Sequence, residues 1–169
     1  MTDFKTYLAK GKQVEEAFAE NLFDVQWADR KQDMFEHWDL AGALTKEGKS
    51  LKFDVKGIKK IRRFDGEYQD DLAWVEFKNV RGNGGWVCGK ADYIAFERFK
   101  EWLLVNREEL LQFAVRKIQD LGRPKGRAPY HIFNRPTRKD ELTLVPFEDM
   151  EKLKHTKRIN KQKQLELGL

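Results

Sequence analysis

The chain has 169 residues, 40% of them hydrophobic and 12% aromatic, which is typical of one globular domain and excludes a disordered chain. No apolar run is long enough to cross a bilayer, and the polar, amphipathic N-terminus is unlike a secretory signal, so no membrane partner is expected. The single cysteine, Cys88, excludes an internal disulfide framework and a cysteine-rich zinc site, and it favours an intracellular protein. The net charge of +5 favours a polyanionic partner.

The first predicted element is a helix from residue 3 to about residue 23. Val14, Phe18 and Leu22 recur at helical spacing and predict one apolar stripe. Glu15 lies within that stripe, where a carboxylate is costly unless another group pairs with it. Glu15 is therefore the first candidate for a functional residue.

Two segments that follow predict a β-hairpin. In EHWDLAGAL (36–44), His37 and Asp39 share one face of the expected strand. In LKFDVKGIKK (51–60), apolar residues alternate with polar ones, so that Asp54 and Lys56 extend side by side from the polar face. The turn TKEGKS between the two segments suits a hairpin, which would bring Asp39 close to Asp54.

The remaining segments predict a mixed α/β domain over residues 1–150, followed by a basic tail or terminal helix over 151–169. FDVQWA (23–28) is an ambiguous strand, and residues 101–120 begin apolar and become helical. Other expected elements are a loop at 63–71, a strand at 71–80, a turn at 81–85, a strand, glycine bend and strand at 85–99, and a pair of strands at 130–133 and 142–147.

The predicted acids Glu15, Asp39 and Asp54 would repel one another unless a cation lies between them. Carboxylate ligands without cysteine favour Mg²⁺ or Mn²⁺ over zinc. A lysine beside such an ion, here Lys56, suits the positioning of a water that attacks a phosphate and the stabilisation of the negative charge that develops. The pattern therefore predicts phosphodiester hydrolysis.

A helix with Glu, a strand with Asp, and then a strand with Asp/Glu-x-Lys resembles the PD-(D/E)XK nuclease superfamily. KGKQVEEAFAENL is similar to the first helix of its Holliday-junction-resolvase-like branch, because Gly11 precedes Glu15 by four residues. HWDL supplies Asp39, and FDVK supplies Asp54 and Lys56. The chain departs from the pattern at Trp38, where the family's proline would stand, and in using Asp rather than the commoner Glu as the second acid.

The resemblance implies a restriction-endonuclease-like core, with a central mixed β-sheet flanked by helices and the active site at one sheet edge. It implies that Glu15, Asp39, Asp54 and the main-chain carbonyl of Val55 hold the metal, and that Lys56 positions the nucleophilic water. It also implies DNA as substrate, with branched DNA favoured by the resolvase-like helix, and a homodimer as one expectation. The motif style is similar to that of proteins from bacteria and their viruses, which implies a cytoplasmic location, in the host if the protein is viral.

WVEFKNV carries a second acid-x-lysine pair, Glu76 and Lys78, which is a rival assignment of the catalytic motif. Basic residues outside both motifs are predicted to contact DNA phosphates. They are Lys12, Lys59, Lys60, Arg123, Lys125 and Arg127. The sequence thus predicts a metal-dependent DNA endonuclease, and the alternative is a non-catalytic nucleic-acid-binding accessory protein with a nuclease-like fold.

Overall fold

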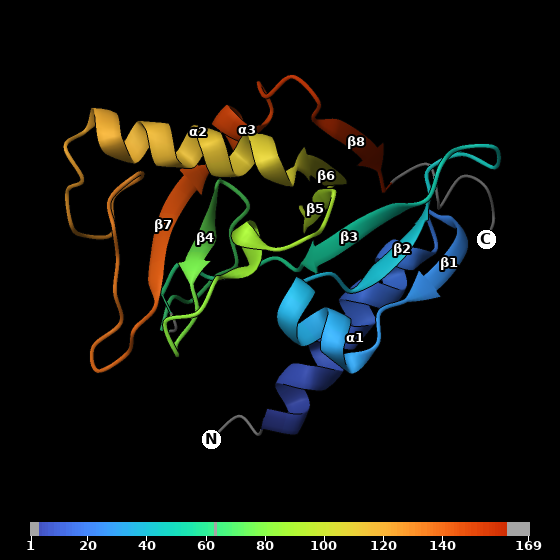
Figure 1. Cartoon of the computed structure of the whole chain (residues 1–169), viewed down its shortest axis with the longest axis horizontal. Coiled ribbons are helices and arrows are strands. Elements are labelled where there is room, and N and C mark those ends of the chain that lie inside the picture. The colour runs from blue at the N-terminus through green and yellow to red at the C-terminus, as the bar shows by residue number, and fades with distance from the viewer. Residues whose placement is uncertain (1–3, 63, 162–169) are drawn as a thin grey trace.

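The computed structural model describes residues 4–62 and 64–161, which fold around two β-sheets (Figure 1). The helical elements are α1 (Phe4–Ala19), the π-helical turn η1 (Gln32–Glu36), the 3-10 turn η2 (Trp86–Cys88), α2 (Arg107–Asp120) and α3 (Phe147–Met150). The strands are β1 (Phe23–Trp27), β2 (Leu40–Ala43), β3 (Leu51–Lys56), β4 (Leu72–Lys78), β5 (Tyr93–Glu97), β6 (Glu101–Asn106), β7 (Glu141–Pro146) and β8 (Lys157–Asn160).

The larger sheet has six strands in the order β1-β2-β3-β5-β6-β8, of which only the pair β3 and β5 is parallel. The predicted hairpin joins β2 to β3 and places Leu40 opposite Phe53. Its turn is closed by the N–H of Gly48, which donates to the carbonyl of Thr45 at 3.0 Å. The expected mixed α/β class, a mixed sheet flanked by helices, is confirmed.

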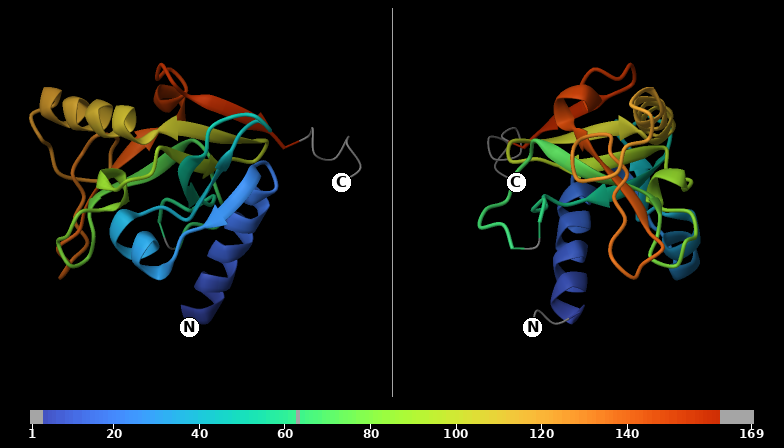
Figure 2. Two further views of the ribbon diagram at one scale, coloured as in Figure 1. Left: turned by 45° about the vertical axis from the view of Figure 1, so that its right-hand side comes forward. Right: turned by 90° about the vertical axis from the view of Figure 1, so that its left-hand side faces the viewer.

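The two faces of this sheet are covered by different helices, as both views of Figure 2 show. On one face Phe18 of α1 is fully buried, and its ring centroid lies 5.1 Å from those of Phe53 and Trp102. Burying a side chain of this size contributes about 2 to 3 kcal/mol, which fixes α1 against β3. The predicted apolar stripe of the first helix is therefore present, although the helix ends at Ala19.

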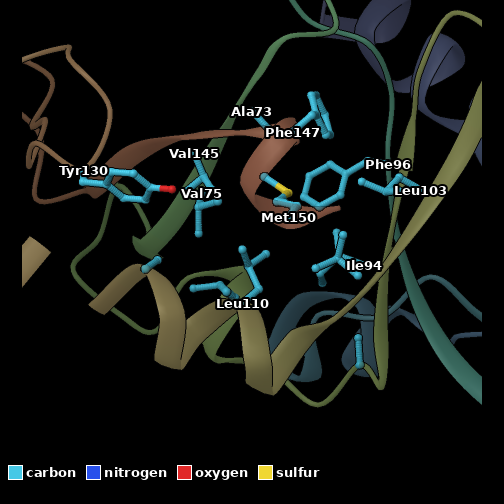
Figure 3. Close-up of a cluster of buried hydrophobic side chains, with 14 of the residues drawn as sticks. Ala73, Val75, Ile94, Phe96, Leu103, Leu110, Tyr130, Val145, Phe147 and Met150 are labelled. Atoms are coloured by element: carbon cyan, nitrogen blue, oxygen red, sulfur yellow. The ribbon is translucent and has the colours of Figure 1, made fainter. Parts of the chain in front are cut away.

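The opposite face packs against α2, α3 and the second sheet, which consists of β4 and β7. Figure 3 shows Ile94 and Phe96 of β5 facing Phe147 and Met150, with Leu110 of α2 close by. Phe96 and Phe147 meet edge to face, with ring centroids 5.4 Å apart. Because both faces are covered, the three central residues of β3, including Asp54, are buried.

Three expectations differ from the structure. The strand predicted at 36–44 begins only at Leu40, because His37 has a left-handed backbone (φ 55°) that ends η1. The first strand predicted within 85–99 is instead the 3-10 turn η2, between Gly85 and Gly89, and it leaves Cys88 exposed. The strands expected at 130–133 and 142–147 meet only in isolated bridges such as Phe133 to Leu142, since β7 pairs mainly with β4.

The C-terminal segment also differs from the basic tail or helix expected over 151–169. Lys157–Asn160 form β8, which pairs with β6 at the edge of the six-stranded sheet. Residues 162–169 lie outside the described residues. Within the part of the chain that the structure describes, none of the helices has the length and apolar character needed to cross a membrane.

Candidate active site

The centre of the candidate site is the pair formed by Asp54 and Lys56 on β3. Residues two apart on a strand share a face, and these two lie beside Ile94 and Phe96, their register partners on β5. Nζ of Lys56 is 2.6 Å from Oδ1 of Asp54. Asp54 is only 3% exposed, whereas the Lys56 side chain is 25% exposed, so the pair extends from the core to an open surface.

Asp39 is held against this pair by the backbone of β3. Its N–H donates to the carbonyl of Phe53 at 2.8 Å, and its Oδ2 accepts from the N–H of Val55 at 2.7 Å. The hairpin thus brings Asp39, Asp54 and Lys56 together as predicted.

Glu15 reaches the same region from α1, between Val14, which packs against the core, and the buried Phe18. Burial, and then the negative charges of Asp39 and Asp33, together raise the pKa of Glu15 to about 7. The ammonium groups of Lys56 and Lys12 oppose that rise. Glu15 is therefore within electrostatic range of both Asp39 and Lys56.

The carboxyl groups of the site carry an excess of negative charge. Burial, and then the charge of Asp54, raise the pKa of Asp39 to about 7. Burial likewise raises the pKa of Asp54, although Lys56 opposes the rise. Oδ2 of Asp54 is buried, and no donor among the described residues reaches it when Asp39 and Asp54 are both ionised. When one of the two acids is protonated, its proton is shared between them. A bound cation would lower the raised pKa values of these acids and would give the buried oxygen of Asp54 a partner.

The described residues contain no ready-made cluster of three or more His, Cys, Asp or Glu side chains with metal-ligand spacing. Asp39 and Asp54 interact directly, whereas Glu15 is coupled to Asp39 through charge alone. The donor set nevertheless fits a hard divalent cation, because it consists of oxygen ligands and includes a buried carboxylate oxygen that lacks a donor.

His37, which was predicted to share a strand face with Asp39, lies elsewhere. It precedes β2, and its Nε2 is 3.1 Å from the carbonyl oxygen of Gly84. The left-handed backbone at His37 explains the difference, because it breaks the alternation that the prediction assumed.

The rival pair, Glu76 and Lys78, lies on β4 in the smaller sheet. The register with β7 shifts between the two residues, which interrupts the alternation. Lys78 is exposed, and its Nζ is 3.4 Å from Oε2 of Glu141. Glu76 instead lines a pocket together with Lys56, and its charge helps to raise the pKa of Lys56 after that of Asp54 and Asp39.

That pocket has a volume of about 920 Å³ and opens from Lys56 between the segment after β3 and the second sheet. Three of the predicted phosphate-contacting residues line it, namely Lys59, Lys60 and Arg127. The other three lie outside it: Lys12 is exposed on α1, Lys125 is exposed on its loop, and Arg123 approaches Glu141 at 3.9 Å.

Sequence reasoning missed the aromatic part of the pocket. Trp74, Trp86 and Phe133 line it from three separate segments of the chain. The Lys56 ammonium lies 5.0 Å from the centroid of the Trp86 ring, which joins the pocket to the acid cluster. The alternation of polar and apolar residues along β4 indicated that one face of this strand lies outside the core, and it was the one sequence signal for this part of the pocket. No local pattern identified Phe133.

Comparisons of the chain with known protein families, with curated proteins and with solved structures found no match.

Proposed function

We propose that the protein is a metal-dependent DNA endonuclease of the PD-(D/E)XK type, built on a restriction-endonuclease-like core. The observation that carries this proposal is the gathering of Asp39, Asp54 and Lys56 at one end of β3, where a buried carboxylate lies within 2.6 Å of a partly exposed lysine. An isolated surface ion pair would not require burial of the acid or raise the pKa of its neighbours.

In this proposal Asp39, Asp54 and Glu15, with the carbonyl of Val55, hold Mg²⁺ or Mn²⁺. When bound, such an ion neutralises phosphate charge and lowers the pKa of water. The N–H of Val55 keeps the Asp39 carboxylate at this end of β3, and Lys56 compensates part of the charge of Asp54.

Lys56 positions the attacking water and stabilises the negative charge that develops on the phosphoryl oxygens. The water oxygen bonds to phosphorus and gives up a proton to solvent, the bond from phosphorus to the sugar oxygen breaks, and that oxygen takes up a proton from solvent. Lys56 suits this role because its partly exposed ammonium lies between the buried acids and the basic pocket. The six basic residues of the pocket, against three acidic ones, favour the approach of a polyanion.

The proposal extends to the setting of the enzyme. Two copies of the chain would present one active site to each strand of a duplex, so we propose a homodimer, which light scattering would test. Branched DNA stays the proposed substrate, and the cytoplasm the proposed location.

Cleavage of labelled linear duplex, single-stranded and four-way-junction DNA tests the proposal. We expect cutting with Mg²⁺ or Mn²⁺, none in EDTA, and loss of cutting in Asp54→Asn but not in the matched variant Glu76→Gln. Circular dichroism would verify that both variants fold. Salt-sensitive binding of DNA without cutting of any substrate would overturn the proposal in favour of a non-catalytic accessory protein.

A further inference from the structure

The pocket beside Lys56 combines an aromatic platform with uncompensated positive charge. Trp74 of β4 and Phe133 lie with ring centroids 5.2 Å apart and an interplanar angle of 37°. Both line the pocket and are only partly buried. Aromatic rings exposed in a basic groove are the surface on which unpaired bases stack.

The platform is held rigidly by its surroundings. The indole N–H of Trp74 donates to the carbonyl of Ile61 at 3.1 Å. Phe133 exchanges two backbone hydrogen bonds with Leu142, the first residue after Glu141 on β7, at 2.8 and 2.9 Å. The rings therefore lose little conformational freedom when a ligand stacks on them, which favours binding.

The charge of the pocket is available to a ligand. Lys59 and Arg127 form no ion pair with another side chain among residues 4–62 and 64–161, whereas Arg135 pairs with Asp140 and Glu97 with Lys161. The Arg127 guanidinium lies 4.8 Å above the Phe133 ring, so cation and platform form one surface. Desolvation, and then the like charge of Lys56, lower the pKa of Lys59, a repulsion that an incoming phosphate would relieve.

The dimensions of the pocket select among nucleic acids. A volume of about 920 Å³ is that of a small-molecule site, enough for about two nucleotides and too small for a duplex. In a duplex the faces of the bases are covered by their neighbours, so only unpaired bases can present a face to Trp74 and Phe133.

We infer that this pocket binds unpaired nucleotides of a DNA strand, with bases against Trp74 and Phe133 and phosphates against Lys59 and Arg127. This inference rests on the proposed nuclease function and specifies its substrate. Because Lys56 belongs to both the acid cluster and the pocket, the cut falls next to the unpaired segment. Single-stranded or branched DNA is then preferred to continuous duplex.

Fluorescence anisotropy in EDTA tests the inference without cleavage. A labelled short oligo(dT) is compared with a duplex of the same length, for the parent protein, Phe133→Leu, Arg127→Gln and the control Arg116→Gln, which alters an exposed arginine of α2 outside the pocket. We expect tighter binding of oligo(dT), weakened about tenfold in Phe133→Leu. Arg127→Gln should also weaken binding and make it less salt-dependent, whereas Arg116→Gln should not.

Equal binding of oligo(dT) and duplex, or equal affinity of the three variants and the parent for oligo(dT), would overturn the inference. The two proposals fail separately. Selective binding of oligo(dT) without metal-dependent cutting would refute the nuclease function and support the nucleotide-binding pocket. Metal-dependent cutting with unchanged oligo(dT) binding in Phe133→Leu would support the nuclease function and refute the pocket.

Discussion

The acid-x-lysine pattern occurs on both β3 and β4, but the burial and the ion pairing of the two residues differ between the strands. On β3, Asp54 is buried and its Oδ1 lies 2.6 Å from Nζ of Lys56. On β4, Lys78 is 53% exposed and lies 3.4 Å from a glutamate on β7, and Glu76 belongs to a pocket that Lys78 does not line. The pattern alone is therefore not a site, because only the central, doubly covered strand forces acid and lysine to compensate each other.

The largest expected contrast concerns folding stability. Lys56→Ala leaves the buried Asp54 without its cation and should lower the free energy of unfolding by about 3 kcal/mol. Lys78→Ala removes an exposed pair and should change that free energy by less than about 0.5 kcal/mol. Urea denaturation at neutral pH measures both. Equal losses would show that the two pairs are buried alike and would contradict the comparison.

Metal affinity sharpens the contrast between the two acids. Asp54→Asn removes a proposed ligand and should weaken Mn²⁺ binding about a hundredfold, whereas Glu76→Gln should leave it within about twofold. Isothermal titration calorimetry gives both dissociation constants. If Glu76→Gln weakened Mn²⁺ binding and Asp54→Asn did not, the metal site would lie on β4.

The pH dependence of stability tests the crowding of carboxylates at β3. The pKa of Glu15 and that of Asp39 are each raised to about 7 in the folded protein, from ordinary values of 4.5 and 3.8. The folded state therefore binds more protons than the unfolded state between these values. The contribution of these two carboxyl groups to stability is fully present below about pH 4 and is lost as the pH rises through 7.

In metal-free buffer this loss should amount to about 3 kcal/mol between pH 5 and about pH 8, most of it from Asp39, after allowance for solvent screening of the partly exposed Glu15. Asp39→Asn should flatten the dependence, and Lys78→Ala should retain it. Denaturation over a series of pH values in EDTA measures the slope. If the free energy of unfolding instead rose with pH over this range, the negative charges of Glu15 and Asp39 would already be neutralised by basic groups of the folded protein.

Several features that depend on local pattern were predicted correctly, although the strand expected from residue 36 begins only at Leu40 and the strand expected from residue 85 is a 3-10 turn. The helical spacing of Val14 and Phe18 predicted α1, and the alternation of LKFDVK predicted β3 and the common face of Asp54 and Lys56. The short turn between the strands predicted that Asp39 would lie beside them, and the backbone hydrogen bond from Val55 bears this out. These features depend on neighbours within one helix or one hairpin, which sequence spacing describes well.

The parts that depend on distant segments were not predicted. Lys157–Asn160 have a charged sequence, yet they form β8 because the edge of β6 offers unpaired backbone groups. The stacking of Trp74 on Phe133 joins residues far apart in the chain through the pairing of β4 with β7, which no local pattern encodes. The pocket was therefore hidden from sequence reasoning, although its basic residues Lys59 and Arg127 were singled out.

Cleavage of single-stranded and four-way-junction DNA in Mg²⁺ by the parent protein, Lys56→Ala and Lys78→Ala shows which of the two strands carries the catalytic lysine. If the pair on β3 is the catalytic motif, Lys56→Ala should cut at least about a hundredfold more slowly while Lys78→Ala stays within about twofold of the parent. Loss of cutting in Lys78→Ala alone would contradict the account and move the active site to β4.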